Sequence, residues 1–303
     1  MSTPTEPTTR TILITGATDG LGRALALRLA GPDVRLILHG RSAERAAAVQ
    51  EQVRAAGGTA DVLLADLAEL RQVDRLADAV LADFDRLDVL VNNAGVGFGA
   101  PGTGREESAD GIELRFAVNY LAGYRLTERL LDRLATSAAS PADSADSAEP
   151  VEPVEPARIV NVASVGQYPL DFADPQTTRA YDGITAYRRS KLAQIIATFD
   201  LADRLATANP ATDRRPVTVN ALHPASLMAT TMVQEAEVAP LSTVAEGVDA
   251  TLRLVTGAAG ALSGRYYDGT REARADAQAY EPAARTRLRA LSAELIAGAL
   301  RRG

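Results

Sequence analysis

The sequence predicts an α/β fold, a single domain built on a doubly wound parallel sheet with helices on both faces. Short apolar runs alternate with longer amphipathic stretches from residue 11 onwards, and this alternation is typical of a parallel sheet covered by helices. The runs are rich in valine, isoleucine and leucine and have no polar face, as expected of strands buried between two helical layers. One such sheet uses most of the 303 residues, so we expect one domain.

The individual elements follow from the same pattern. Strands are expected at residues 11–15, 34–39, 61–65, 87–91, 158–162 and 217–221. Apolar residues at helical spacing predict helices at 20–30, 42–56, 70–84, 108–135 and 186–208, and another within 282–300. We therefore divide the chain into a flexible N-terminal tail (1–10), the sheet-forming domain (11–270) and a C-terminal helical extension (271–303).

Residues 137–157 interrupt the alternation. They contain Ser, Ala, Pro and acids without apolar periodicity, and such a composition buries too little surface to offset the entropy of ordering. We expect a disordered loop here, with an acidic partner-binding segment as the functional alternative.

Composition excludes several classes of protein. The net charge of −7 disfavours electrostatic binding of nucleic acid. The absence of cysteine excludes disulfides and thiolate chemistry, and two histidines leave little for a metal site, so we expect no metal. The N-terminus has no secretory pattern, and no apolar run approaches the roughly 18–20 residues of a membrane span. We expect a soluble, cytoplasmic protein.

The first strand runs directly into a glycine-rich turn, TGATDGLG at residues 15–22, after which a helix begins. Glycine lets the backbone turn tightly and approach a pyrophosphate closely, and the N–H groups that open the helix can receive the anion. An ordinary strand-to-helix turn is the alternative. The order of strand, turn and helix favours nucleotide binding.

The ends of the next two strands suggest which nucleotide is bound. An acid at the end of the second strand would bind the adenosine ribose of NAD, but Arg41 stands there, and its guanidinium suits the extra phosphate of NADP. Arg23 could assist. We therefore favour NADP(H) over NAD(H). After the third strand, Asp66 could hold the adenine amino group, could cap the following helix, or could do both.

Polar residues that could carry chemistry follow the later strands. Residues 92–95 (NNAG) follow the fourth strand, Asn119 lies in the next helix, and Ser164 comes just after the fifth strand. Tyr187 and Lys191 are four residues apart, so they share one helix face about 6 Å apart along its axis. A nearby ammonium lowers the pKa of a tyrosine and so brings it closer to the range of efficient acid–base catalysis.

Together these residues, in this order, resemble the short-chain dehydrogenase/reductase family over roughly residues 10–270. The resemblance implies a Rossmann fold, and it implies that Asn119, Ser164, Tyr187 and Lys191 are catalytic. Tyr187 would exchange the proton with the substrate oxygen and Ser164 would orient that oxygen. Lys191 would bind the nicotinamide ribose and lower the pKa of Tyr187, and Asn119 would hold a water of the proton relay. The implied cofactor-binding residues are Gly16, Thr18, Asp19, Gly20, Leu21, Gly22, Arg41, Asp66, Leu67, Asn93, Ala94, Gly95, Tyr187, Lys191 and Pro224.

The chain departs from the family pattern in three places. Residues 170–182 lengthen the segment between Ser164 and Tyr187 and should border the substrate opening. This length and the sequence of the tyrosine helix resemble the retinol-dehydrogenase-like branch, which implies a bulky or apolar substrate. At Asp19 the NADP-preferring members often have a basic residue, which is an argument against our choice of cofactor.

The third departure follows the sixth strand. His223 and Pro224 are followed by alanine where this branch has glycine, and the expected cofactor-binding threonine is replaced by alanine at 229, with threonine at 230 and 231. Either threonine could contact the cofactor. We expect His223 to be structural rather than catalytic.

The leading prediction is an NADPH-dependent reductase of a ketone or aldehyde, or the reverse alcohol dehydrogenase. The alternative is a catalytically silent NADP-binding sensor or scaffold. A sugar-nucleotide epimerase of the family's extended branch is disfavoured, because that branch has the motif TGxxGxxG and this chain has TGxxxGxG. We expect a small-molecule partner and a possible homo-oligomer paired through the helices of Asn119 and Tyr187.

Overall fold

The computed structural model describes residues 9–100, 102–136, 155–208, 216–235 and 237–302. In these residues one sheet has the strand order β3-β2-β1-β4-β5-β6-β7-β8. The strands from β1 to β7 are parallel, and β8 pairs with β7 in antiparallel fashion. Their bounds are β1 (Arg10–Ile14), β2 (Val34–Gly40), β3 (Thr59–Leu64), β4 (Val89–Asn92), β5 (Ala157–Val162), β6 (Val217–His223), β7 (Arg265–Asp268) and β8 (Arg271–Glu272).

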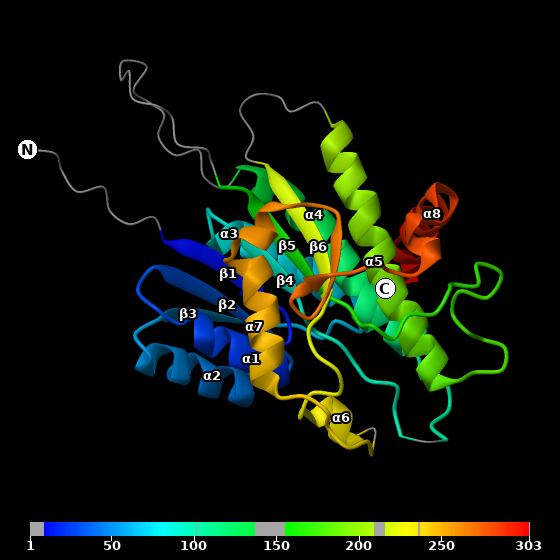
Figure 1. The fold of residues 1–303 in the computed structure, drawn as a ribbon, viewed down its shortest axis with the longest axis horizontal. Coiled ribbons are helices and arrows are strands. Elements are labelled where there is room, and N and C mark those ends of the chain that lie inside the picture. Colours follow the sequence, from blue (N-terminus) through cyan, green and yellow to red (C-terminus); the bar gives the residue numbers. More distant parts are fainter. Residues whose placement is uncertain (1–8, 101, 137–154, 209–215, 236, 303) are drawn as a thin grey trace, which may run out of the picture.

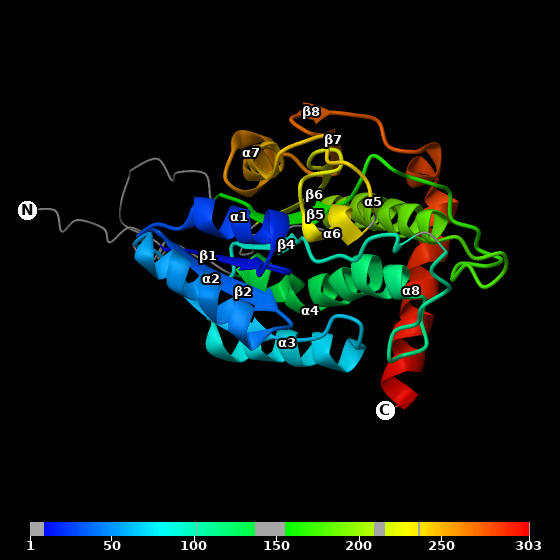
Figure 2. The same ribbon diagram turned by 90° about the horizontal axis from the view of Figure 1, so that it is seen from below.

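Helices cover both faces of the sheet, as Figures 1 and 2 show. One buried apolar cluster joins α1, α2 and α7 to the sheet, and another joins α3, α4, α5 and α8 to the opposite face. The helices are α1 (Gly20–Leu29), α2 (Ala43–Ala55), α3 (Leu70–Asp83), α4 (Ala122–Thr136), α5 (Gly183–Thr207), α6 (Thr231–Glu235), α7 (Val244–Val255) and α8 (Pro282–Arg302), with a π-helical turn η1 (Phe116–Leu121) and the 3₁₀ turns η2 (Ala258–Ala261) and η3 (Ala277–Tyr280).

The predicted fold class is confirmed, because a parallel sheet is enclosed by two helical layers. Strands β7 and β8 and helix α7 were not predicted from the sequence. The start of α7 did carry a signal, since Thr243 and Glu246 form a reciprocal capping box. The helix expected at 108–135 is also interrupted, because a π-helical turn at 116–121 precedes α4.

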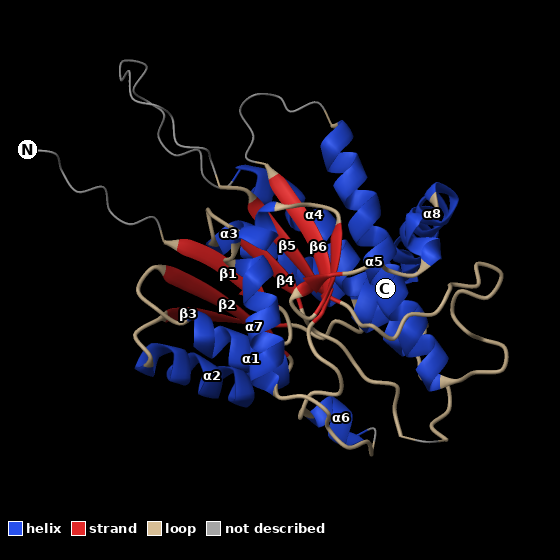
Figure 3. Ribbon diagram, in the orientation of Figure 1, coloured by secondary structure: helices blue, strands red, loops and turns tan. Residues whose placement is uncertain are grey.

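The strand order reverses between β1 and β4, since β2 and β3 lie to one side of β1 and β5 to β7 lie beyond β4. Ligands of open parallel sheets bind outside the carboxyl ends of the strands at such a reversal. The long connections that follow β4 and β5 run out past this end of the sheet (Figure 3). The fold therefore brings the glycine-rich turn, the NNAG segment and Ser164 to one place.

Helix α8 crosses α5 on the outside of the second layer and does not lie along it (Figure 2). The Tyr120 hydroxyl lies 2.6 Å from the Ser292 hydroxyl, and Arg289 donates to Asp200 over 2.6 Å. This packing covers part of the surface through which we expected a second copy to pair, and pairing remains a prediction. The predicted disordered loop and N-terminal tail lie largely outside the described residues. None of the described helices combines the length and apolarity needed to cross a membrane.

Candidate active site

The glycine-rich turn is packed so tightly that its glycines are required. A Cβ on Gly22 would lie 2.1 Å from the Gly16 carbonyl oxygen, and Gly16 and Gly20 have φ of +65° and +49°. Asp19 caps α1 by accepting from the Gly20 N–H at 2.7 Å. Leu21 is buried within α1. The Asp19 carboxylate thus takes up one of the N–H groups at the end of the helix that a pyrophosphate would approach.

The NNAG segment is bonded directly to this turn. The Asn93 amide donates to the carbonyl oxygens of Thr15 (2.9 Å) and Gly16 (3.1 Å). The Thr15 hydroxyl in turn accepts from the backbone N–H groups of Asn93 and Ala94, each at 3.0 Å. Predicted residues from β1 and β4 therefore form one hydrogen-bonded unit at the carboxyl end of the sheet.

His39 joins the glycine turn to the end of β3, a role that the sequence did not suggest. Its Nδ1 accepts from the Gly16 N–H at 3.2 Å, so its Nε2 carries the proton and donates to the Ala65 carbonyl oxygen at 3.1 Å. Burial lowers the pKa of His39 to about 4. A neutral imidazole is required here because a protonated Nδ1 could not accept the Gly16 hydrogen bond.

Arg41 follows β2 at the surface, where its guanidinium is exposed. Among the described residues no carboxylate pairs with it, whereas Arg23 donates to the Gln52 side chain at 2.9 and 3.2 Å. Gly40 lies against Thr18, because a Cβ on Gly40 would be 2.3 Å from the Thr18 methyl group. Arg41 is therefore the cation at this strand end that is available to a ligand.

Asp66 shapes the turn after β3 and does not cap the helix. Its carboxylate accepts from the Ala68 N–H at 3.0 Å, but the N-cap of α3 is Glu69. The capping role considered for Asp66 is therefore wrong, because the turn places the helix start three residues further on. Leu67 is buried in the core.

Ser164 and Tyr187 come together at the end of β5. Tyr187 is partly buried in the first turns of α5, and the surrounding protein raises the pKa of its phenol, while a hydrogen bond with the Ser164 side chain opposes that rise. The Ser164 hydroxyl also accepts from the Gly166 N–H at 3.0 Å. The phenol accordingly keeps its proton at neutral pH, as a proton donor must.

Lys191 lies one helical turn beyond Tyr187, with its Nζ 5.7 Å from the centre of the Tyr187 ring. Nζ donates to the Val162 carbonyl oxygen at 2.9 Å and to Gln194 Oε1 at 3.1 Å. Burial lowers the pKa of Lys191 to about 7. We expected Lys191 to lower the pKa of Tyr187, but that pKa is raised. Desolvation dominates the pKa of Tyr187, and the opposing effect comes from the hydrogen bond with the Ser164 side chain.

Asn119 lies in the π-helical turn η1, and its side chain fixes the segment that follows β4. Its Oδ1 accepts from the Val96 N–H at 2.7 Å, and its Nδ2 donates to the Val96 carbonyl oxygen at 3.1 Å and to the Ser190 hydroxyl at 3.0 Å. Ser190 donates to the Tyr187 carbonyl oxygen at 2.7 Å. Gly95 is needed beside it, since a Cβ there would lie 3.2 Å from Asn119 Oδ1. Asn119 thereby couples the NNAG segment to the tyrosine helix.

The segment after β6 faces the same site. Pro224 is buried, and His223 holds Ser226 through Nε2 at 3.1 Å. Burial lowers the pKa of His223, and the positive charge of Lys191 adds to this effect while Asp268 opposes it. Thr231 donates to Asp19 at 2.6 Å, so this threonine reaches the glycine turn.

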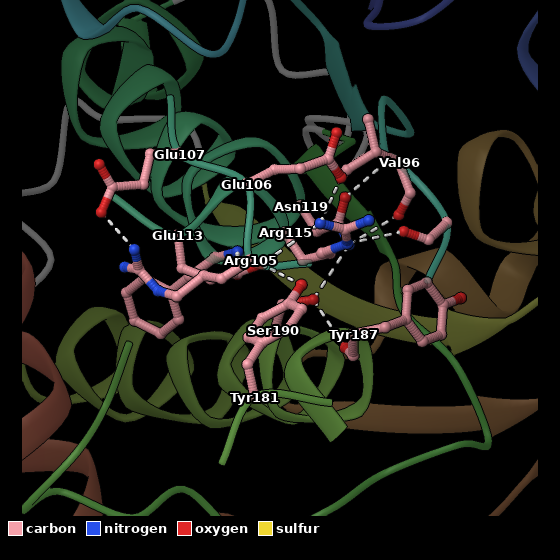
Figure 4. Close-up of polar contacts among 12 residues, drawn as sticks. Val96, Arg105, Glu106, Glu107, Glu113, Arg115, Asn119, Tyr181, Tyr187 and Ser190 are labelled. Carbon is pink, nitrogen blue, oxygen red and sulfur yellow. Dashed lines mark hydrogen bonds and ion pairs between the residues drawn. The ribbon is translucent and has the colours of Figure 1, made fainter. Parts of the chain in front are cut away.

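A second group of polar residues, which the sequence did not predict, lies near Asn119 and Ser190 (Figure 4). We call Arg105, Glu106, Glu113, Arg115 and Tyr181 the rim cluster. Arg115 and Glu113 are buried, and burial raises the pKa of Glu113. The only sequence signal is a run of charges between residues 105 and 115, and charge runs usually lie on solvated surfaces.

The residues around the strand ends fit a nicotinamide dinucleotide. The glycine turn that opens α1, the exposed guanidinium of Arg41 and the Nζ of Lys191 lie along one edge of the sheet. Within the described residues, no group of three or more histidine, aspartate or glutamate side chains is arranged to hold a metal ion.

Comparison with known proteins agrees with this geometry. The family model described as short chain dehydrogenase matches residues 10–240. Retinol dehydrogenase 14 of Mus musculus is 38% identical over 229 residues, 71% of this chain and 60% of that protein. The putative daunorubicin C-13 ketoreductase DnrU of Streptomyces sp. (strain C5) is 45% identical over 127 residues, 42% of this chain and 43% of that protein. The chain thus matches less than two thirds of the length of these relatives.

Solved structures share the fold. The Pseudomonas aeruginosa RhlG/NADP active-site complex superposes with a TM-score of 0.65 at 24% identity, over 87% of this chain and 97% of that chain. The angucycline C-6 ketoreductase LanV with bound NADP gives a TM-score of 0.61 at 24% identity, over 87% and 96% of the two chains. At this identity the likeness establishes the fold alone.

The chain belongs to the short-chain dehydrogenase family. The expected resemblance to the retinol-dehydrogenase-like branch is confirmed, since retinol dehydrogenases 11–14 are 31–38% identical to it.

Proposed function

We propose that the protein is an NADP(H)-dependent carbonyl reductase that converts a bulky apolar ketone into an alcohol. The observation that carries the proposal is the convergence of Ser164, Tyr187, Lys191 and Asn119 at the carboxyl end of the sheet, beside the glycine turn. All four side chains are present and mutually placed, which supports turnover over a silent cofactor-binding role.

The preference for NADP(H) rests on Arg41. It is exposed at the end of β2, where the adenosine ribose of a dinucleotide lies in this fold, and the strand ends in no acid that would repel a phosphate. The negative charge of Asp19 disfavours an anion at the glycine turn. Its carboxylate, however, accepts hydrogen bonds from the Gly20 N–H and the Thr231 hydroxyl. NADP is also bound in the complexes of RhlG and LanV.

The chemistry follows from the protonation states of the site. NADPH, when bound, supplies the hydride. The Tyr187 hydroxyl gives its proton to the carbonyl oxygen as that oxygen gains negative charge, and Ser164 donates a hydrogen bond that orients the same oxygen. Because burial raises the pKa of Tyr187, the phenol is the proton donor that reduction requires.

The substrate class rests on exposed apolar side chains that lie close to Ser164 and Tyr187 in the sequence. Val165 and Tyr168 follow Ser164, and Ile184 precedes Tyr187 on α5; all three are exposed. Leu241, beyond α6, is 73% exposed. Exposed apolar side chains next to a site favour an apolar ligand. Relatives named as retinol dehydrogenases and as a daunorubicin ketoreductase support a bulky substrate.

The substitution Tyr187→Phe tests the proposal. It should reduce kcat about 100- to 10,000-fold, the usual contribution of a general acid, and leave NADPH binding, measured by the fluorescence of the nicotinamide, unchanged. Tyr124→Phe is the matched control, because Tyr124 is a partly buried tyrosine on α4 away from the site. Equal turnover in the wild type and the Tyr187→Phe protein would refute the role of the phenol.

A further inference from the structure

Phe98 stands beside the proposed proton donor. Its ring packs edge-on against the Tyr187 ring, with centroids 5.9 Å apart and planes at 79°. The Phe98 backbone reaches the first turn of α5, because a Cβ on Gly183 would lie 2.2 Å from the Phe98 carbonyl oxygen. Phe98 is partly exposed. The Phe98 ring is therefore an aromatic neighbour of the Tyr187 ring.

Two side chains hold the backbone that leads to Phe98, and they stand one helical turn apart. Asn119 binds both the N–H and the carbonyl oxygen of Val96, and Arg115 Nε donates to the Gly97 carbonyl oxygen at 3.0 Å. Residues four apart share a helix face, so both act on consecutive residues from the same side (Figure 4). Asn119 belongs to the family's catalytic set, whereas Arg115 has no role in it.

Arg115 is buried, with an exposed fraction of 2%. Its Nη1 lies 2.8 Å from the Glu106 carboxylate and 3.7 Å from that of Glu113. A buried charge is costly unless it is paired. The two carboxylates provide the ion pairs, although Nη1 itself makes no hydrogen bond to the described residues. The paired guanidinium can then keep Nε on the Gly97 carbonyl.

The same cluster joins the loop that follows β4 to the segment that precedes α5. Glu113 accepts from the Tyr181 hydroxyl at 3.1 Å, and the Glu113 N–H donates to the Gln176 side chain at 3.1 Å. Arg105 donates to the Gln176 carbonyl oxygen at 3.2 Å. Residues 170–182, the insertion before the tyrosine helix, are thus tied to the loop that carries Phe98.

We propose that Arg115 and Glu113 are positioning residues that fix residues 96–98 to the insertion 170–182, so that Phe98 forms an aromatic wall beside Tyr187 and selects ketones that carry an aromatic ring. This inference rests on the proposed function for its substrate and on the rim cluster for its geometry. Aromatic rings prefer edge-on or offset contacts with one another, and a saturated ring of the same size cannot make that contact.

The first experiment measures how strongly Arg115 restrains the loop at residues 96–100, and it does not depend on catalytic activity. In hydrogen–deuterium exchange of the full chain, Arg115→Met should speed exchange of residues 96–100 and 174–182 about tenfold, the effect of losing one charge-assisted hydrogen bond. Arg125→Met is the matched control, because Arg125 is a paired arginine further along the same helical segment that binds Asp74 at 2.7 Å. Exchange equal to wild type in both segments would overturn the positioning role.

A second variant answers the objection that Arg115→Met leaves the buried Glu113 carboxylate unpaired and so prevents folding. The double variant Glu113→Gln with Arg115→Met removes both charges and keeps the side-chain volumes. It should show the same faster exchange, and Arg115→Lys should not restore the wild-type rate because lysine cannot hold a carboxylate and a carbonyl in one fork. Wild-type exchange in the double variant would contradict the proposal.

The third experiment tests the aromatic wall with two bicyclic ketones of equal size, α-tetralone, which has an aromatic ring, and α-decalone, which is saturated. Phe98→Leu should lower the kcat/KM ratio of tetralone to decalone by about three- to tenfold, through KM for tetralone, the size of one aromatic contact. NADPH affinity should not change. An unchanged ratio would contradict the proposal that Phe98 selects aromatic ketones.

The two proposals fail in different ways. If the wild type reduces neither ketone, the proposed function fails for this substrate class and the aromatic wall falls with it, while the exchange experiment still decides the role of Arg115. If the wild type reduces both equally, the reductase stands and the selection by Phe98 is refuted.

Discussion

The cofactor end and the substrate end of the candidate active site are held together by different kinds of groups. At the cofactor end, residues 15–22 and 92–95 are held by backbone groups and short side chains, such as the Asn93 amide on Thr15 and Gly16. At the substrate end, long side chains of the rim cluster hold loops whose backbone has no regular structure. A tight turn that tolerates only certain residues can be recognised as a motif in the sequence. A loop held by arginines and acids that are distant in the sequence has no such motif.

This difference explains how much could be predicted. The sheet was predictable because buried parallel strands must be apolar runs, and the closeness of Tyr187 and Lys191 was predictable because residues four apart share a helix face. Strand β7 is only four residues long, RYYD, with an exposed residue at each end, too short for a periodic signal. Arg115 and Glu113 looked like a solvated charge run, and only the fold, which encloses them, shows that they are buried.

The direction in which the pKa of Tyr187 is shifted could not be predicted from the sequence. Spacing places Lys191 near Tyr187, but spacing carries no information on how much water surrounds either group. Burial decides the pKa directions of both, raising that of Tyr187 and lowering that of Lys191. Burial depends on the packed structure, so the sign could not be obtained from two residues four positions apart.

If the cofactor end is rigid, the largest loss of stability should come from substituting Gly22, the glycine of the turn with the least space for a side chain. Gly22→Ala places a methyl group 2.1 Å from the Gly16 carbonyl oxygen, and a backbone atom cannot move aside as a side chain would. We expect the free energy of unfolding to fall by about 3 kcal/mol or more, the upper range for overpacking, and NADPH binding to be lost with it. Urea unfolding and nicotinamide fluorescence measure the two effects.

Gly298→Ala is the control for this substitution. Gly298 lies within α8, and a Cβ there would meet no atom within 4 Å. Alanine should therefore stabilise the protein by about 0.5–1 kcal/mol through its helix propensity. Equal stability of the Gly22→Ala variant and the wild type would contradict the tight packing of the turn.

The next largest effect is a pH dependence at the same end. Because the pKa of His39 is lowered from 6.5 to about 4, the folded state binds fewer protons than the unfolded state between these pH values. The contribution of the neutral imidazole is therefore present above pH 6.5 and is lost as the pH falls towards 4. The linkage amounts to about 3 kcal/mol.

The variant His39→Gln isolates this contribution. It removes the titrating group, so its free energy of unfolding should fall less steeply than that of the wild type between pH 6.5 and 4. Parallel unfolding curves for the two proteins across this window would show that His39 does not bind the Gly16 N–H as a neutral imidazole.

A smaller effect is expected at the exposed edge of the cofactor site. Arg41→Gln should raise the KM for NADPH about tenfold, the size of one charge-assisted contact with a phosphate, and leave the KM for NADH unchanged. Arg45→Gln is the matched control, an exposed arginine one turn further along in α2. Equal changes in KM for NADPH and NADH would show that Arg41 does not bind the 2′-phosphate of NADPH.

The smallest effect should come from the substrate end. Tyr181→Phe deletes the hydroxyl that donates to Glu113 at 3.1 Å while Phe116 and Arg115 remain in contact with that carboxylate. The free energy of unfolding should fall by about 1 kcal/mol, with NADPH affinity unaffected. A loss as large as that of Gly22→Ala would erase the contrast between the two ends.

The most direct test of the central claim is the oxidation of NADPH and NADH, followed at the reduced-nicotinamide absorbance band, with aliphatic, aromatic and terpenoid ketones and aldehydes. The account predicts ketone-dependent oxidation of NADPH, much slower oxidation of NADH, and loss of both in the Tyr187→Phe protein. No oxidation with any carbonyl, and no reduction of NADP with the corresponding alcohols, would contradict the assignment as a carbonyl reductase.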